Sequence, residues 1–254
     1  MIGCGKMGGA LLSHWMSGGE RFTVVDPALE TVPDGARLVR ERDEIAEERF
    51  DVVIVAIKPQ MVDEVLPDYA SSLAEGGYVL SIAAGCSIDR LSRLMDDAPV
   101  VRVMPNLPAA VGKGVSGLCA GPGAGDALAH AKAMMDRTGT AVVVADEDRI
   151  DRVTAVSGSG PGYVFEIARA YVDAAMAQGF SPEEARAMVL GTMEGAIAMA
   201  LQPGAPDLAE LRNSVTSKGG TTAAGLAALN GDEGLSQRLR ETLEAAYDRA
   251  VELR

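Results

Sequence analysis

Short apolar runs alternate with segments of helical periodicity over the first half of the chain. The runs are nearly continuous in Val, Ile, Leu and Ala, which is typical of parallel strands covered on both faces. They occupy residues 22–26, 51–58, 78–84 and 100–104, and helical patterns lie between them at 11–16, 60–73 and 87–95. This alternation predicts a Rossmann-type, doubly wound parallel sheet. Apolar runs at 115–120 and 141–144, with a helical pattern near 126–138 between them, complete it.

The pattern becomes helical throughout from about residue 148. Ser181–Glu184 combines an N-cap residue, a proline at the first helical position and two acids, which is a strong helix start. Gly191 and Gly195 lie one turn apart in that helix, and each costs about 1 kcal/mol relative to Ala, which favours a close helix crossing. We therefore predict a sheet domain over 1–147 and an all-α domain over 148–254 that forms a subunit interface. Its helices are expected at 151–178, from 182 onward, and at 208–215, 223–229 and 235–253.

Composition and charge exclude several classes of function. The 254 residues suffice for two domains, and 48% apolar with only 4% aromatic residues predicts a core of Ala, Val, Leu and Met. The formal net charge of −13 argues against a nucleic-acid or anionic-membrane partner. An anionic ligand would therefore have to be held by local backbone amides rather than by a general positive field.

The three cysteines, Cys4, Cys86 and Cys119, are too few and too scattered for a disulfide framework or a zinc cluster. No metal site is expected, and a reducing cytoplasmic compartment is the simplest interpretation. The sequence also contains no apolar run of membrane-spanning length and no signal-peptide pattern.

The first glycines of the chain, Gly3, Gly5 and Gly8, have the spacing G-x-G-x-x-G before a helical pattern. In a dinucleotide-binding turn the first glycine permits the turn, the second lets the pyrophosphate approach and the third lets helix and strand pack. The strand before this turn is only Met1-Ile2, although it would lie in the middle of the sheet. We therefore expect that the chain begins short of its natural start.

Ligands of such sheets bind beyond the carboxyl ends of the strands, where several loops of this chain meet. A nicotinamide dinucleotide, NAD(P)H, spans these loops naturally. The predicted cofactor-binding residues are Gly3, Gly5, Lys6, Met7, Gly8, Asp26, Ala56, Lys58, Pro59, Ala83, Ala84, Gly85 and Asn106.

Asp26 ends the second predicted strand, 18 residues after Gly8, and two interpretations of it remain open. A carboxylate here can accept a hydrogen bond from the ribose 2′-hydroxyl and repel a 2′-phosphate, which favours NADH. Alternatively, Asp26 turns outward and caps the following turn, which leaves a 2′-phosphate in solvent. The next residues, Pro27 to Glu30, bring no cation.

The segment Asn213–Asn230 predicts a helix that stops, a tight turn at Gly219-Gly220 and a new helix from Thr221. Unpaired backbone N–H groups and the positive end of the new helix make such a turn suitable for a carboxylate. The hydroxyls of Ser217, Thr221 and Thr222 either cap the helix or contact a ligand.

Five motifs in this order resemble the pyrroline-5-carboxylate reductase family over nearly the whole chain. They are Gly3–Ala10, Ala56–Pro59, Met104–Pro108, Ser157–Pro161 and Thr216–Thr222, of which the last two are specific. The resemblance implies a Rossmann domain and a helical domain that interlocks two subunits, sometimes within a larger ring such as a decamer. It implies reduction of the cyclic imine 1-pyrroline-5-carboxylate to L-proline with NAD(P)H. Lys218 departs from the proline that is common in the family.

The resemblance also implies roles at the predicted turn. The amides of Gly219, Gly220 and Thr221, together with Ser217, suit the substrate carboxylate, and the Thr222 hydroxyl is placed to hydrogen-bond the ring nitrogen and relay a proton. Asn106 and the loop Ala83–Gly85 are expected to line the nicotinamide pocket.

Two other classes of protein remain as alternatives. The first is a related imine or β-hydroxyacid reductase, but a hydroxyacid enzyme is expected to carry a catalytic lysine in the first long helix after the sheet. Residues 151–178 contain no lysine. The second is a non-catalytic dinucleotide-binding regulator, which would bind the cofactor without turnover.

Overall fold

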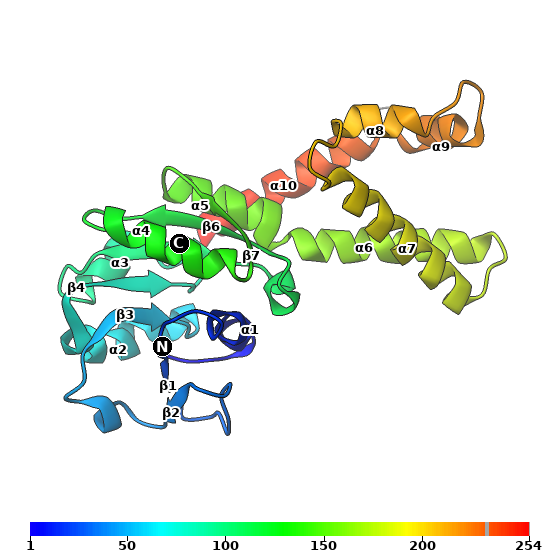
Figure 1. Ribbon diagram of the computed structural model, residues 1–254. Coiled ribbons are helices and arrows are strands. Elements are labelled where there is room, and N and C mark those ends of the chain that lie inside the picture. The colour runs from blue at the N-terminus through cyan, green and yellow to red at the C-terminus, as the bar shows by residue number, and fades with distance from the viewer. Residues whose placement is uncertain (232–233, 254) are drawn as a thin grey trace. The chain divides into compact units, whose positions relative to one another are not determined.

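The computed structural model describes residues 1–231 and 234–253. They form two compact units, one of residues 1–161 with 245–253 and one of residues 162–231 with 234–244 (Figure 1). The domain boundary that we predict after residue 147 stays a prediction.

The first unit is built on parallel strands flanked by helices. The strands β3 (Phe50–Val55), β4 (Leu73–Ser81) and β5 (Val100–Met104) are parallel, and β1 (Thr23–Val25) pairs in parallel with β2 (Arg37–Val39). Ile2 bridges Val25 and Val55, so the short strand before the glycine turn lies between β1 and β3. The strand β2 is not among the predicted elements.

The predicted sheet is parallel throughout, and this is wrong at one pair of strands. β6 (Gly114–Ala120) runs antiparallel to β5, while β7 (Gly139–Val143) runs parallel to β6. Only the 3₁₀ turn η4 (Leu107–Val111) separates β5 from β6, and a parallel return requires a longer crossover.

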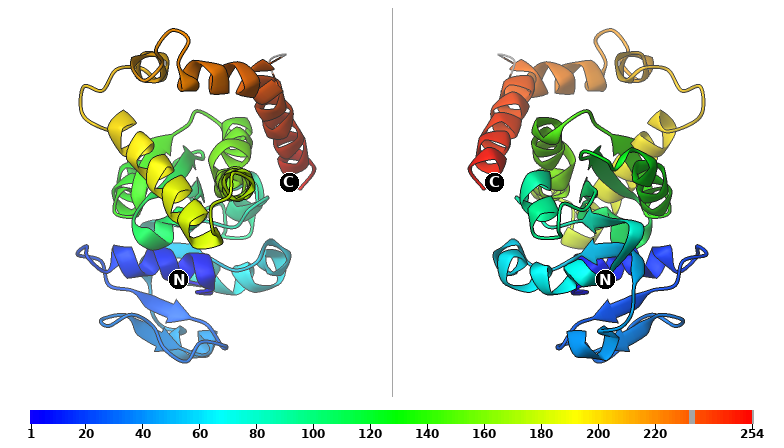
Figure 2. Two further views of the ribbon diagram at one scale, coloured as in Figure 1. Left: turned by 90° about the vertical axis from the view of Figure 1, so that its right-hand side faces the viewer. Right: turned by 90° about the vertical axis from the view of Figure 1, so that its left-hand side faces the viewer.

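Helices cover both faces of this sheet (Figure 2). Alternate residues of one strand divide between two buried clusters, with Val53 and Val55 in one and Ile54 in the other. The cluster of Ile54 includes Trp15, which is fully buried and stacks on Phe22 with ring centroids 6.1 Å apart. The helices of this unit are α1 (Lys6–Trp15), α2 (Val62–Val65), α3 (Ile88–Arg93), α4 (Gly125–Asp136) and α5 (Glu147–Val153).

Short helical turns complete the first unit. The helical segment predicted at 60–73, in which Pro67 allows an interruption, consists of η2 (Pro59–Met61), α2 and η3 (Leu66–Ser72). η1 (Arg42–Ile45) follows β2. A π-helical turn, η5 (Thr154–Gly158), follows α5 and covers part of the motif Ser157–Pro161.

Four helices account for most of the second unit. Their bounds agree with the predicted helices to within a few residues, except that the helix predicted from 151 is divided into the end of α5, the turn η5 and α6. They are α6 (Gly160–Ala177), α7 (Pro182–Ala200), α8 (Leu208–Ser214) and α9 (Thr221–Leu229), followed by α10 (Gly234–Glu252), whose last turns belong to the first unit. Ser181 caps α7 in a capping box with Glu184, as predicted. In the described part of the chain, no helix is both long and apolar enough to cross a membrane.

Candidate active site

The glycine turn has the three features that a pyrophosphate-binding turn requires. Gly3 has φ +75°, and an added Cβ would lie 2.7 Å from the Ile57 Cγ2 atom. A Cβ on Gly8 would lie 2.6 Å from the Met1 side chain and 3.4 Å from Ala56, so this glycine permits close packing of α1. Gly5 has open space around it and begins α1 with no side-chain cap. The first N–H groups of α1 are therefore available to an anion.

Asp26 does not point freely into this turn. Its Oδ2 atom accepts a hydrogen bond from the Cys4 backbone N–H at 2.9 Å, and its Oδ1 atom accepts one from the Ala28 N–H at 2.9 Å. The carboxylate thus ties the end of β1 to the glycine turn and caps the turn that follows. Of the two interpretations of Asp26, capping is the one that these contacts favour.

The remaining predicted cofactor residues lie at the same edge of the sheet. The Ala56 N–H donates to the Ile2 carbonyl, and exposed Lys58 precedes η2, which begins at Pro59. Lys6 is exposed and Met7 half-buried in the first turn of α1. After β4, Ala83 is buried, Ala84 is exposed and Gly85 has φ +72°. A Cβ on Gly85 would lie 2.4 Å from the Leu253 carbonyl oxygen, so no other residue fits there without a shift.

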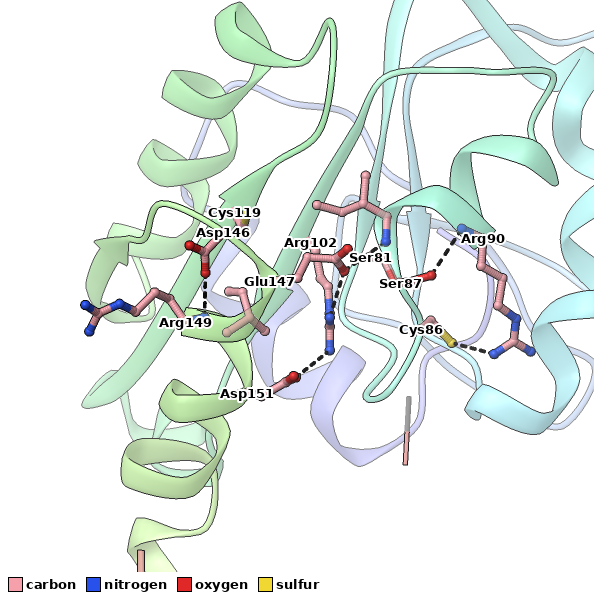
Figure 3. A network of polar contacts seen from close by, with 12 residues as sticks. Ser81, Cys86, Ser87, Arg90, Arg102, Cys119, Asp146, Glu147, Arg149 and Asp151 are labelled. Carbon is pink, nitrogen blue, oxygen red and sulfur yellow. Dashed lines mark hydrogen bonds and ion pairs between the residues drawn. The ribbon is translucent and has the colours of Figure 1, made fainter. Parts of the chain in front are cut away.

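A buried ion-pair network supports the loop after β4 (Figure 3). Arg102 on β5, whose side chain is 3% exposed, pairs with Glu147 at 2.8 Å and with Asp151 at 3.4 Å. The same Glu147 oxygen accepts from the Ile88 N–H at 2.9 Å and thereby fixes the start of α3. Arg102 thus fixes, through Glu147, the residues that follow the loop 83–85. The network was missed in the sequence, although an arginine inside the apolar run Val100–Met104 was the available signal.

Asn106 is buried, and both ends of its amide are engaged. Its Nδ2 atom donates to the Ser157 carbonyl at 2.9 Å, and its Oδ1 atom accepts from the Val115 N–H at 2.8 Å. Asn106 therefore joins the end of β5 to the π-helical turn η5. Its expected place beside the nicotinamide stays a prediction.

The turn between α8 and α9 belongs to the second unit and has the predicted form. Gly219 has φ +73°, which favours glycine, and a Cβ on Gly220 would lie 2.3 Å from the Ser217 hydroxyl, which would have to shift. The Gly220 N–H donates to the Ser217 carbonyl at 3.0 Å and is not available to a ligand. Gly220 begins α9 without a side-chain cap, and Ser217, Thr221 and Thr222 are exposed. The N–H groups of the first turn of α9 therefore remain without a cap.

Predicted residues thus lie at two turns of similar build, one in each unit. At both turns a glycine with positive φ precedes a helix that has no side-chain cap. Among the described residues, no group of three or more His, Cys, Asp or Glu side chains could hold a metal ion. His130 bridges the Tyr78 hydroxyl at 3.0 Å and Glu20 at 3.3 Å.

The chain is similar in sequence to known proteins. Residues 147–253 match the family model for pyrroline-5-carboxylate reductase dimerisation, and residues 1–85 match that for NADP oxidoreductase, coenzyme F420-dependent. The pyrroline-5-carboxylate reductase of Haemophilus influenzae is 34% identical, with 99% of this chain and 96% of that protein covered. The one of Pseudomonas aeruginosa is 36% identical over 99% and 95%.

Solved structures agree with the sequence comparison. A pyrroline-5-carboxylate reductase from Coxiella burnetii superposes with a TM-score of 0.90 at 30% identity, covering 99% of this chain and 96% of that one. A Plasmodium falciparum pyrroline carboxylate reductase with NADP bound superposes with a TM-score of 0.84 at 25% identity, with the same coverage. The chain is thus an oxidoreductase with a Rossmann-type sheet and a helical dimerisation region, and it belongs to the pyrroline-5-carboxylate reductase family.

Proposed function

We propose that this chain reduces the C=N bond of 1-pyrroline-5-carboxylate with NAD(P)H to give L-proline, the last step of proline biosynthesis. The observation that carries the proposal is the uncapped turn at Gly219–Thr222, which presents free backbone amides in a chain of this family. The substrate carries one carboxylate, and the chain carries a net charge of −13. A site made of backbone dipoles binds that carboxylate without a cationic side chain.

The first unit holds the cofactor in this proposal. The Gly3–Gly8 turn and the N-terminus of α1 receive the pyrophosphate, and the loops after β3 and β4 follow the dinucleotide along the sheet edge. A bound nicotinamide dinucleotide supplies the hydride. The protein's task at this end is to orient that group, and the Arg102 network fixes the start of α3 next to the loop 83–85.

The second unit holds the substrate. The Gly219, Thr221 and Thr222 amides bind the carboxylate, beside the Ser217 hydroxyl, while the Gly220 amide keeps the turn closed. The Thr222 hydroxyl hydrogen-bonds the ring nitrogen and relays a proton to it. Protonation makes the imine carbon more electrophilic, so alignment and charge fixation are the main demands on the protein.

The oligomeric state of the chain is inferred from its helical region. We infer a homodimer formed through the helical region, with a larger ring such as a decamer as a further step. Support comes from the dimerisation match over residues 147–253 and from large apolar side chains exposed on this unit, among them Phe165 at 63% and Ile197 at 59%. Gly191 and Gly195 have open space around them within one chain. A helix of a second copy could therefore approach α7 closely at these two positions.

We also propose that the protein works in the cytoplasm. The three cysteines are free and buried, and burial raises the pKa of each thiol. Such thiols are poor nucleophiles and play no part in the proposed reaction.

The test is oxidation of NAD(P)H with 1-pyrroline-5-carboxylate beside a six-membered cyclic imine and a hydroxyacid–oxoacid pair. We expect turnover with the five-membered imine and at most weak turnover with the oxoacid. Preferred turnover of the oxoacid would make the chain a hydroxyacid reductase. Cofactor binding without turnover of any of these compounds would support the alternative of a non-catalytic, dinucleotide-binding regulator.

A further inference from the structure

The end of β1 has a cation beside it that the sequence order conceals. β1 and β2 pair in parallel with Val25 opposite Val39, and the Asp26 N–H donates to the Val39 carbonyl at 3.2 Å. The next residue along β2 is Arg40, so Asp26 and Arg40 follow paired positions at the same edge of the sheet. In the sequence they stand 14 residues apart, and the residues directly after Asp26 bring no cation.

Arg40 also reaches across to the other strand. Its guanidinium donates to the Pro27 carbonyl oxygen at 3.2 Å, and the residue is exposed. A guanidinium has five N–H donors, so one bond to a neutral carbonyl leaves a fork for a further acceptor. Within residues 1–231 and 234–253, no carboxylate forms an ion pair with it. The nearby Glu44 carboxylate instead accepts from the backbone N–H groups of Arg40 and Glu41, at 2.6 and 3.0 Å.

The Asp26 carboxylate is held by two backbone N–H groups, since one oxygen accepts from Cys4 and the other from Ala28. Those two bonds maintain the glycine turn and the turn after β1. Each oxygen keeps a second lone pair, but a carboxylate supplies no positive charge for a 2′-phosphate.

In a Rossmann-type sheet the adenosine ribose lies at the end of the second strand, and an arginine nearby accommodates a 2′-phosphate. We propose that Arg40 is the residue of this chain that binds the 2′-phosphate of NADPH, and that Arg40 rather than Asp26 determines the choice of cofactor. The inference rests on the proposed function and names its cofactor. The net charge of −13 supplies no general positive field for a 2′-phosphate, so the local cation Arg40 is the group that can attract it.

The test is a calorimetric titration of the whole chain with NADP⁺ and with NAD⁺, without any imine present. We expect wild type to bind NADP⁺ at least about tenfold more tightly than NAD⁺. Arg40→Gln should weaken NADP⁺ binding about tenfold to hundredfold, the usual effect of losing a hydrogen bond to a charged group. The Kd for NAD⁺ should change less than about twofold, because NAD⁺ carries no 2′-phosphate. Arg40→Lys keeps the charge but not the forked guanidinium, so its affinity for NADP⁺ should lie between that of wild type and that of Arg40→Gln.

Arg42→Gln is the matched control. It removes the same charge two residues away, but the Arg42 guanidinium donates to the Asp68 carbonyl and the Ser71 hydroxyl, each at 3.0 Å. Its ratio of the two Kd values should equal that of wild type. Raised salt should weaken NADP⁺ binding more than NAD⁺ binding in wild type, and the difference should shrink in Arg40→Gln.

Three results would overturn the assignment: equal affinity of wild type for both dinucleotides, an equal loss for both in Arg40→Gln, or the same change of ratio in Arg42→Gln. These results are distinct from failure of the proposed function. A chain that binds NADP⁺ as expected but does not turn over 1-pyrroline-5-carboxylate contradicts only the proposed reaction. Equal turnover with NADH and NADPH, together with equal affinity for both dinucleotides, contradicts only the role of Arg40.

Discussion

The two units of this chain bury their apolar residues very differently. In the first unit, two clusters of buried side chains lie on the faces of a sheet. In the second unit, among the described residues, the buried hydrophobic side chains are only Ala168, Ala185 and Val189, although the helices are rich in apolar residues. A sheet with helices on both faces completes its own core, whereas helices with exposed apolar faces need another surface to cover them. The first unit therefore has a core of its own, whereas the second has apolar helix faces that nothing in the described part of the chain covers.

The same contrast applies to the candidate site. In the first unit the predicted residues Asp26 and Asn106 are held by contacts within the unit. In the second unit the predicted ligand groups are exposed and make few contacts. We therefore expect substitutions in the first unit to change stability and those at the α8–α9 turn to change turnover.

The largest effect is expected at Thr222, where the contrast predicts loss of rate without loss of stability. Thr222→Val keeps the volume but removes the proposed proton donor, and the rate should fall about 10²–10⁴-fold. The melting temperature and the Kd of the cofactor should not change, because this hydroxyl caps no helix. Thr222→Ser keeps a hydroxyl and should restore much of the rate. Turnover of the valine variant within about threefold of wild type would remove Thr222 from the chemistry.

The opposite outcome is expected at Arg102. Arg102→Met leaves the carboxylates of Glu147 and Asp151 without their buried partner, and such a loss typically costs about 3–5 kcal/mol. Urea unfolding followed by circular dichroism measures this cost. The control is Arg149→Met. Arg149 is exposed and lies on α5, the helix that carries Glu147 and Asp151, and its substitution should cost less than about 0.5 kcal/mol. A cost below about 1 kcal/mol for Arg102→Met would mean that the network contributes little.

Gly191 tests whether the second unit is completed by a second copy. An added Cβ meets nothing within 4 Å in one chain, so in a monomer Gly191→Ala should stabilise α7 by about 1 kcal/mol. At a close crossing between subunits, Gly191→Leu should instead cost about 1–3 kcal/mol and favour dissociation. Light scattering and the concentration dependence of the melting temperature separate the two cases. A wild-type monomer at micromolar concentration would contradict the proposed dimer.

A smaller effect is expected at Glu20 in the first unit. Hydrogen bonds from Arg137 lower the pKa of this carboxyl to about 2, from 4.5. A carboxyl with a depressed pKa in the folded state stabilises the fold above its unfolded pKa, and this stabilisation is lost as the pH falls through the folded pKa. Glu20→Gln should therefore cost about 1–2 kcal/mol at pH 7, after allowance for solvent screening. The cost should shrink between about pH 4.5 and pH 2 in urea titrations. A cost that is independent of pH would point to packing instead.

The features that could be predicted from the sequence are those set by residues close together in the chain. The glycine turn, the capping box at Ser181 and the turn at Gly219-Gly220 each depend on a few consecutive residues, and all three have the expected form. Periodicity likewise located most strands and helices. Strand β2 was not predicted, because the three residues Arg37-Leu38-Val39 are too few to show a pattern of apolar positions.

Features set by distant residues could not be predicted in this way. The antiparallel direction of β6 depends on which strands meet, and the direction of the Asp26 carboxylate depends on the Cys4 amide, 22 residues away. The Gly220 amide was expected to face a ligand, but the turn uses it for the Ser217 carbonyl. Sequence motifs thus indicated where the ligand groups lie but not which of their donors are already engaged.

The stacked pair of Trp15 and Phe22 gives the chain an optical label for one of its two units. Trp15 is the only tryptophan of the 254 residues, and it is fully buried in the first unit. Its emission during denaturation therefore reports the loss of that unit alone, while far-ultraviolet circular dichroism reports helix from both. If the two units unfold together, the two signals share one midpoint. If the helical unit loses its structure first, on dilution of the subunits, the ellipticity falls while the tryptophan emission stays at its native wavelength.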